Sequence, residues 1–303
     1  MRFLRDRGYE LVQAPANVSE EDLIRLVPGK DALIVGVEKI TERVIQAADR
    51  LRIICKHGAG VDNIDVAAAT RAGIPVTNVP GANSDAVADL AFGLMLAAAR
   101  SIPRADRAVR AGEWPLLLGT EVWRKTLGII GTGRIGKQVA RRARGFEMQI
   151  LGYDPHPDPA FAEEIGMTYV PLEELLRRSD FVTIHVPLTH ATRGLIGRRE
   201  IALMKPEAFL FNLSRGSAVD EVALYEALAS GRLAGAGLDV FAVEPPGKEN
   251  PLMQLENVIV TPHMGAYTRE AVLAVGMQTV QNIHRVFCGE RPLNVVNLEV
   301  LEA

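Results

Sequence analysis

Cysteine is scarce in this sequence, with only Cys55 and Cys288 among 303 residues. The two stand far apart and lack the spacing of metal ligands, and two thiols cannot form the disulfide framework of a small secreted protein. We therefore expect a protein of a reducing compartment, the cytoplasm, that holds no metal.

An excess of charge of one sign and a long apolar run are absent as well. The formal net charge is −3, which gives no electrostatic footprint for nucleic acid or an anionic membrane. The longest apolar run, residues 90–99, is about half as long as a membrane span. Residues 1–7 carry too many charges for a signal peptide. We therefore expect neither a nucleic-acid partner nor a membrane.

What is present is an ordinary globular composition on a chain long enough for two domains. Hydrophobic residues make up 48% and charged residues 23% of the sequence, as in soluble globular proteins. A chain of 303 residues exceeds one compact core of typical size, so two domains are the starting expectation.

The first 80 residues alternate helix-like and strand-like stretches and carry no glycine-rich phosphate motif. This alternation predicts an α/β domain with parallel strands. We assign residues 1–82 and 270–303 to a separate substrate domain. Helical stretches are expected at residues 3–7, 20–26, 41–48 and 66–72, and strand-like ones at 9–13, 32–37, 51–56 and 76–79.

A long helix is predicted over residues 86–99, with capping side chains at residues 83–85. An arginine-rich stretch continues it to residue 112, and an apolar segment follows to residue 118. Apolar side chains on such an extended arm favour packing against a second subunit, which predicts a homodimer. The alternative is an arm that covers part of its own chain.

Three glycines follow a short apolar strand at residues 127–130. Gly131 allows a tight turn, Gly133 lets backbone N–H groups approach a pyrophosphate, and Gly136 lets the next helix pack closely on the sheet. The phosphates would lie at a helix N-terminus, where unpaired N–H groups and the helix dipole stabilise negative charge. An ordinary glycine turn has the same spacing, so the pattern alone is weak.

The next strand, residues 148–153, strengthens the dinucleotide interpretation. It ends at Asp154, which stands 18 positions after Gly136, close to the offset of about 20 for the carboxylate that binds the adenosine ribose. An acid at this point repels a 2′-phosphate, so NAD is predicted rather than NADP. The alternative is a solvated acid in the proline-rich turn of residues 154–159.

Strand-like segments then recur along the chain, most of them separated by helices. This pattern predicts a doubly wound, Rossmann-type domain over residues 83–269, with ligands at the carboxyl ends of its strands. The segments cover residues 127–130, 148–153, 168–170, 181–185, 208–213, 234–238 and 258–260.

Arg215, Glu244 and His263 follow three successive strands of this domain. A guanidinium grips a carboxylate through two parallel hydrogen bonds. An imidazole beside a carboxylate keeps its proton to higher pH and can act as an acid when a carbonyl is reduced. With NAD, these groups are suited to hydride exchange with a 2-oxo or 2-hydroxy acid. Alternatively, Arg215 forms a surface ion pair, Glu244 is an acid in a turn, and His263 is a structural histidine.

In this order and spacing, the motifs resemble those of the D-isomer-specific 2-hydroxyacid dehydrogenases. The similarity runs from about residue 51 to residue 296 and implies two doubly wound parallel-sheet domains, with a flavodoxin-like substrate domain beside the NAD domain. The motifs are GTGRIG at 131–136, NLSRG at 212–216, DVF at 239–241 with Glu244-Pro245, and TPH at 261–263.

The resemblance assigns a role to each motif. It implies that Arg215 holds the substrate carboxylate, that His263 is the acid/base, and that Glu244 positions His263. Asp239 resembles the partner of the nicotinamide amide, and residues 185–187 with Thr192 resemble the wall on the adenosine side. The implied cofactor residues are Gly131, Gly133, Arg134, Ile135, Gly136, Asp154, His185, Pro187, Thr192, Leu213, Ser214, Asp239 and Gly265.

Residues 56–65 resemble the substrate loop of D-3-phosphoglycerate dehydrogenases, in which an arginine commonly occupies the position of Lys56. A lysine keeps the charge but lacks the planar fork, so a phosphate is plausible but less assured; alternatively, Lys56 merely ends a strand. The candidate substrate residues are Lys56, Gly58, Ala59, Gly60, Asn83 and Arg215.

We therefore predict an NAD-dependent D-2-hydroxyacid dehydrogenase similar to the phosphoglycerate dehydrogenases. Reduction of hydroxypyruvate or glyoxylate is the nearest alternative, and an NAD(H)-sensing corepressor with the same three residues is a rival of another class. Family members open with a strand that this chain lacks, so a truncated start is an alternative. The chain ends soon after residue 298, so no regulatory domain or feedback control is expected.

Overall fold

The computed structural model describes residues 2–15 and 18–302. The chain divides into two compact units, which we describe separately. Unit 1 consists of Met1–Asn83 and Thr268–Ala303, and unit 2 consists of Ser84–Tyr267.

Unit 2 is built on a parallel sheet of seven strands in the order β10-β9-β8-β7-β4-β5-β6. The order reverses between β7 and β4, which is the topological switch point where open α/β sheets bind ligands. Because all pairings are parallel, the carboxyl ends of the strands share one edge. The strands are β4 (Thr126–Ile130), β5 (Gln149–Tyr153), β6 (Met167–Tyr169), β7 (Phe181–Ile184), β8 (Phe209–Asn212), β9 (Gly235–Leu238) and β10 (Val258–Val260).

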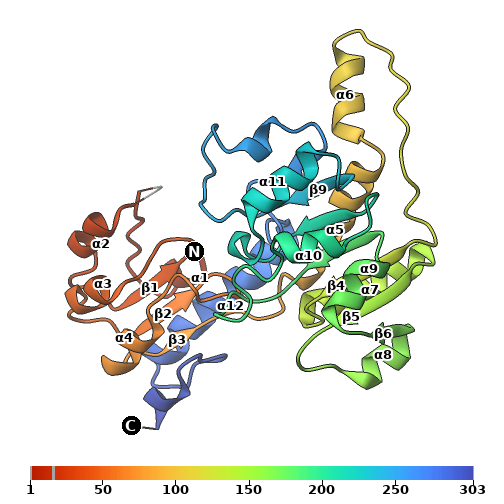
Figure 1. Ribbon diagram of the computed structural model, residues 1–303. Helices are drawn as coiled ribbons and strands as arrows, with labels where there is room; N and C mark the ends of the chain where they lie inside the picture. Colours follow the sequence, from red (N-terminus) through yellow and green to blue (C-terminus); the bar gives the residue numbers. More distant parts are fainter. Residues whose placement is uncertain (1, 16–17, 303) are drawn as a thin grey trace. The chain divides into compact units, whose positions relative to one another are not determined.

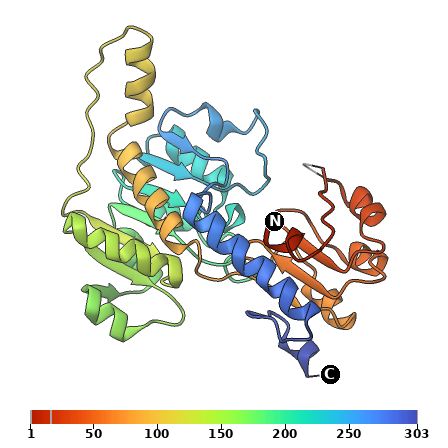
Figure 2. The same cartoon turned by 180° about the vertical axis from the view of Figure 1, so that it is seen from behind.

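Helices cover both faces of this sheet, as the two opposite views show (Figures 1 and 2). Successive strand residues point to opposite faces: in β8, Phe209 and Phe211 join one hydrophobic core and Leu210 joins the other. The helices of unit 2 are α5 (Ser84–Ala99), α6 (Ile102–Arg110), α7 (Arg134–Ala143), α8 (Pro159–Ile165), α9 (Leu172–Arg178), α10 (Arg198–Leu203) and α11 (Glu221–Ala229).

The helix predicted over residues 86–99 is formed as α5, and the arginine-rich stretch after it contains a separate helix, α6. Helix α5 ends at Ala99, and α6 begins at Ile102 after Ser101 adopts a left-handed φ of 49°. A residue in that conformation cannot continue a right-handed helix. None of the residues of α6 is buried, and α6 with the segment behind it projects from the body of unit 2 (Figure 2).

Unit 1 contains a parallel sheet of three strands in the order β1-β2-β3. Its two faces are covered by different helices, because Ile54 of β2 joins a core with α2 to α4 whereas Ile53 and Cys55 join one with α1 and α12. The elements are α1 (Arg2–Arg5), α2 (Glu20–Leu26), β1 (Ala32–Val35), α3 (Glu42–Ala47), β2 (Ile53–Lys56), α4 (Val66–Arg71), β3 (Val76–Thr77) and α12 (Arg269–Phe287).

The strand expected at residues 9–13 is not formed. Side chains rather than ladder hydrogen bonds hold this segment, since the Tyr9 hydroxyl lies 2.9 Å from Nδ1 of His284 and its ring packs on Phe287. Leu11 packs against the same core. The apolar pattern of residues 9–13 therefore reflects packing against α12 and not pairing in a sheet.

Among the described residues, no single helix is long and apolar enough to cross a membrane. Among these residues, only α5 and α6 taken together have the length and composition of a membrane span. The two helices are bent by 61° relative to each other.

Candidate active site

The glycine turn after β4 has the geometry of a phosphate cradle. Gly131 has a φ of +89°, and a Cβ there would lie 2.7 Å from the His185 carbonyl oxygen. Gly136 lies so close to the turn that a Cβ would meet the Gly131 oxygen at 2.1 Å. Neither position tolerates a side chain.

The N-terminus of α7 is left open for a ligand. Its N-cap is Gly133, and no side chain caps the helix, although Asp158 and Asp220 cap α8 and α11 in the usual way. A Cβ on Gly133 would meet nothing within 4 Å. Uncapped N–H groups beside open space are what a pyrophosphate requires, so the turn fits NAD.

Asp154 is tied to this turn by hydrogen bonds. Its Oδ2 accepts from the backbone N–H of Thr132 at 2.8 Å and from the Thr132 hydroxyl at 3.3 Å, and its Oδ1 accepts from the amide of His156 at 2.9 Å. A carboxylate has about four acceptor positions, so capacity remains for a ribose hydroxyl.

Thr132 and Tyr169 belong to the same network and were missed in the sequence. The Thr132 hydroxyl lies 2.8 Å from the Tyr169 hydroxyl, which also accepts from the amide of Asp158 at 3.0 Å. Asp158 in turn pairs with Lys137 in the first turn of α7. Threonine stands at a variable position of the glycine pattern and Tyr169 ends a strand, so no motif marked either one.

His185 and the loop after it lie beside the glycine turn. Burial lowers the pKa of His185 to about 3, so its ring is neutral. Its Nε2 lies 2.9 Å from the Thr183 hydroxyl, and its buried Nδ1 has no partner within the described part of the chain. Thr192 shapes the loop by donating to the Pro187 carbonyl at 2.6 Å.

Arg215 is positioned by the residues at the end of β8. The buried Asn212 donates through Nδ2 to the Arg215 carbonyl at 2.9 Å and accepts from the Ser214 hydroxyl at 2.9 Å. Gly216 then packs directly on the next loop, since a Cβ there would lie 1.8 Å from the Phe241 carbonyl carbon. This contact fixes the backbone of Arg215 relative to the loop that carries Glu244.

Glu244 and His263 form a close pair. Nδ1 of His263 lies 2.7 Å from Oε2 of Glu244, with the two side chains 43% and 33% exposed. Half-burial opposes ionisation of Glu244, but hydrogen bonds from His263 and from the Phe241 amide, with the charges of His263 and Arg215, outweigh it and lower the Glu244 pKa. The carboxylate form is therefore favoured in the folded state.

Asp239 holds the turn on which His263 stands. His263 has a left-handed φ of 51°, which is unusual for a residue other than glycine. The buried Asp239 accepts from the Thr261 hydroxyl at 2.6 Å, the Met264 amide at 2.8 Å and the Gly265 amide at 2.9 Å. One acceptor position remains for the nicotinamide amide that the resemblance implies.

The other predicted cofactor residues also lie at or next to this edge of the sheet. Arg134 and Ile135 begin α7, and Ile135 packs partly against the core. Leu213 and Ser214 follow β8 and are buried. Unit 2 therefore holds every predicted cofactor residue and the three predicted catalytic ones.

The remaining predicted substrate residues lie in unit 1. Lys56 ends β2, and its ammonium donates to the Gly36 carbonyl and to Oδ1 of Asn63. The Gly58 and Ala59 carbonyls accept from the Val79 amide and from Asn78 Nδ2, which ties the loop through Gly60 to the segment after β3. Asn83 is the last residue of the first part of unit 1.

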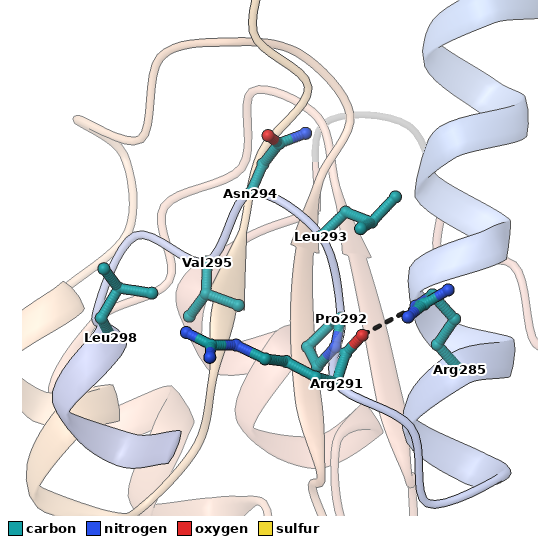
Figure 3. A pocket seen from close by; sticks show the side chains of 7 residues that line it. All are labelled: Arg285, Arg291, Pro292, Leu293, Asn294, Val295 and Leu298. Atoms are coloured by element: carbon teal, nitrogen blue, oxygen red, sulfur yellow. Dashed lines mark hydrogen bonds between the residues drawn. The ribbon is translucent and has the colours of Figure 1, made fainter. Parts of the chain in front are cut away.

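A separate hollow of about 310 Å³ lies near the end of unit 1 (Figure 3). Arg285 donates there to the carbonyl of Arg291 at 2.7 Å. None of the predicted site residues lines this hollow, so it is not the candidate site. Within residues 2–15 and 18–302, no three His, Cys, Asp or Glu side chains cluster as a metal site would require.

The fold and the site together define a dinucleotide-binding α/β protein with a hydrogen-bonded histidine and glutamate at the carboxyl edge of its sheet. The profile of the D-isomer specific 2-hydroxyacid dehydrogenase NAD binding domain matches residues 92–265. The chain belongs to the D-isomer-specific 2-hydroxyacid dehydrogenase family, and NAD is the cofactor of its unit 2.

Individual relatives agree with this assignment. A D-3-phosphoglycerate dehydrogenase of Methanocaldococcus jannaschii is 49% identical over 95% of this chain, which spans 55% of that relative's length. A glyoxylate reductase of Korarchaeum cryptofilum is 45% identical over 97% of this chain and 90% of its own length. The crystal structure of the TT0316 protein from Thermus thermophilus matches with a TM-score of 0.92 and 37% identity, covering 97% and 95% of the two chains.

Proposed function

We propose that this chain is an NAD-dependent dehydrogenase that interconverts a D-2-hydroxy acid and its 2-oxo acid. The observation that carries the proposal is the contact of 2.7 Å between His263 and Glu244. It lies at the same sheet edge as Arg215 and the glycine turn. An acid/base pair, a guanidinium and a dinucleotide cradle at one edge are the groups that this reaction needs.

Arg215 binds and orients the substrate in this proposal. Its guanidinium pairs with the substrate carboxylate through two parallel hydrogen bonds, which fixes the direction of the neighbouring 2-oxo group. Asn212 supports the backbone of Arg215, and the packing of Gly216 on Phe241 limits its movement. We assign unit 1, which holds the other predicted substrate residues, as the substrate domain.

His263 moves the proton. A carboxylate can only accept a hydrogen bond, so Glu244 fixes a proton on Nδ1 and leaves Nε2 to exchange one with the substrate oxygen. In reduction His263 donates its proton to the 2-oxo group, and in oxidation it removes the proton of the 2-hydroxyl. NAD(H), when bound, supplies or accepts the hydride at carbon 2. Asp154 favours it over NADP(H), because its charge repels a 2′-phosphate.

A substrate panel tests the proposal. The parent enzyme would be assayed in both directions with 3-phosphoglycerate, D-lactate, D-glycerate, hydroxypyruvate, glyoxylate and 2-oxoglutarate, each with NAD(H) and NADP(H). We expect turnover of at least one acid, with the larger kcat/KM for the NAD(H) form. Tight NADH binding without turnover of any acid would favour the sensor function over the enzyme.

The proposal includes a cytoplasmic homodimer. The arm formed by α6 and residues 111–118 carries apolar side chains that have no cover within unit 2. Trp114, Leu116 and Leu118 are 84%, 99% and 100% exposed. Burial of such residues against a second copy removes apolar surface from water, which supports a twofold dimer.

A further inference from the structure

We propose that Lys56 is a positioning residue that locks two loops of unit 1 together, and that the substrate is therefore a 2-oxo acid without a phosphate group. This inference rests on the proposed function and narrows its substrate class. It departs from the simplest interpretation of Lys56, in which its charge binds the phosphate of 3-phosphoglycerate.

The ammonium of Lys56 is engaged within the protein. It donates to the Gly36 carbonyl after β1 and, at 2.8 Å, to Oδ1 of Asn63. The Asn63 amide continues the network, since its Nδ2 donates to the Gly36 carbonyl at 3.2 Å and to the Glu38 carbonyl at 2.6 Å. Lys56 thus joins the loop of residues 36–39 to the loop of residues 56–63.

The backbone on both sides of this network is held in the same register. The Ile40 amide donates to the Asn63 carbonyl at 2.8 Å, and the His57 amide donates to the Val35 carbonyl at 2.8 Å. If Lys56 turned outward to bind a phosphate, Oδ1 of Asn63 would lose its donor, and the Gly36 carbonyl would keep only the hydrogen bond of 3.2 Å from Asn63 Nδ2. Half-buried acceptors without a donor are costly.

The charges around Lys56 do not favour a phosphate either. Oε2 of Glu38 accepts from the Gly36 amide at 2.8 Å, which places a carboxylate within the same network. Burial lowers the pKa of His57, and the charge of Lys56 lowers it further, so His57 adds no cation near neutral pH. A phosphate dianion needs donors that are free to pair with it.

The test compares two acids that differ only in a phosphate group, hydroxypyruvate and 3-phosphohydroxypyruvate. We expect the parent enzyme with NADH to use hydroxypyruvate about tenfold better or more, the equivalent of one lost charge-assisted hydrogen bond. A preference for the phosphorylated acid would overturn the inference and leave the proposed dehydrogenase function intact. Failure to turn over these two acids and every acid of the substrate panel would overturn both the inference and the proposed function.

Variants of Lys56 and Asn63 distinguish a positioning role of Lys56 from direct binding of a phosphate. Lys56→Met should lower kcat/KM for both acids by a similar factor and speed the hydrogen exchange of the Ile40 amide. Selective loss of activity on the phosphorylated acid would show that Lys56 grips phosphate. Asn63→Ala keeps the ammonium but removes its partner, so it should reproduce the effects of Lys56→Met; it also decides the question if Lys56→Met does not fold.

Lys39→Met is the matched control. Lys39 is an exposed lysine on the same loop, so its replacement removes one positive charge without opening the network. We expect no change in kcat/KM for either acid or in the hydrogen exchange of the Ile40 amide. If Lys39→Met lowered both kcat/KM values as much as Lys56→Met, the loss of a positive charge rather than the loss of the loop connection would explain the effect, and the positioning role of Lys56 would be overturned.

Discussion

At the scale of single residues, the account depends on how the Glu244 carboxylate acts on its neighbour. Glu244 lies 2.7 Å from His263, and its pKa is lowered below the ordinary 4.5. A carboxyl group with a lowered pKa contributes stability that is fully present above its unfolded value and is lost as the pH falls through its folded value. Glu244 is therefore ionised throughout the neutral pH range and can accept the hydrogen bond from His263.

Replacing Glu244 by Gln tests this role. The amide can present a donor or an acceptor to Nδ1 and no longer fixes the proton there, so turnover of the 2-oxo acid should fall. The loss of turnover at the pH optimum should be smaller than the roughly 10²–10⁴-fold loss expected for His263→Ala, which removes proton transfer itself. The measurement is kcat against pH for the parent and both variants. An unchanged kcat across the pH range in Glu244→Gln would contradict the assignment.

The two cysteines should differ sharply in reactivity. Burial raises the pKa of Cys55 to about 12, although the Thr77 hydroxyl donates to its sulfur, whereas Cys288 is exposed. A thiol reagent at pH 8 should label one site in the native protein and two after unfolding, and mass spectrometry would locate each label. Because unfolded Cys55 ionises near 9.0, stability should fall as the pH rises between about 9 and 12. Rapid native labelling of Cys55 would contradict its burial.

At the scale of elements, the close approach of two loops sets the geometry of the site. A Cβ on Gly216 would lie 1.8 Å from the Phe241 carbonyl carbon and 2.2 Å from the Ala242 nitrogen. Both are backbone atoms that cannot turn aside. The segment that carries Arg215 and the loop that carries Glu244 must therefore be in contact without an intervening side chain.

Gly216→Ala should separate these segments. Overpacking of this kind costs about 1–3 kcal/mol or more of unfolding free energy, and the displacement of Arg215 should raise KM and lower kcat together. Denaturant unfolding and steady-state kinetics measure the two effects. Gly93→Ala in α5 is the control, because a Cβ there meets nothing within 4 Å. A Gly216→Ala enzyme with the stability and kinetics of the parent would refute the packing argument.

The sequence predicted most elements because their apolar patterns and caps are local signals. The parallel α/β order, the glycine turn and the strands before Arg215, Glu244 and His263 all follow from such patterns. The left-handed turn at Ser101 and the separate helix α6 after it were not predicted, since the turn depends on the φ of one residue. Residues 9–13 look like a strand because the alternate residues Tyr9 and Leu11 pack against the core that contains α12.

The supporting residues of the candidate site were less accessible to prediction. The sequence placed the charged residues at strand ends, but not the three hydrogen bonds by which Asp239 holds the turn of His263. It marked Lys56 as a charge and did not reveal that Gly36 and Asn63 accept its hydrogen bonds. Such pairings join segments distant in sequence, and neither spacing nor composition encodes them.

At the scale of the whole molecule, the exposed arm predicts self-association. Sedimentation at micromolar concentration should give the mass of a dimer for the parent chain. The double variant Leu116→Asp, Leu118→Asp should give a folded monomer, because two charges on the arm oppose burial of its apolar surface. Val222→Asp, at another exposed apolar position of unit 2, should remain dimeric. A monomeric mass for the parent would contradict the predicted dimer.

The configuration of the product formed from a 2-oxo acid and NADH shows directly whether the enzyme is a D-2-hydroxyacid dehydrogenase. The parent enzyme would be incubated with the best acid of the panel that gains a stereocentre on reduction, and the 2-hydroxy acid would be resolved by chiral chromatography. The account predicts NADH-dependent formation of the D-enantiomer alone. An L-enantiomer or a racemic product, or NADH binding without any product, would contradict it.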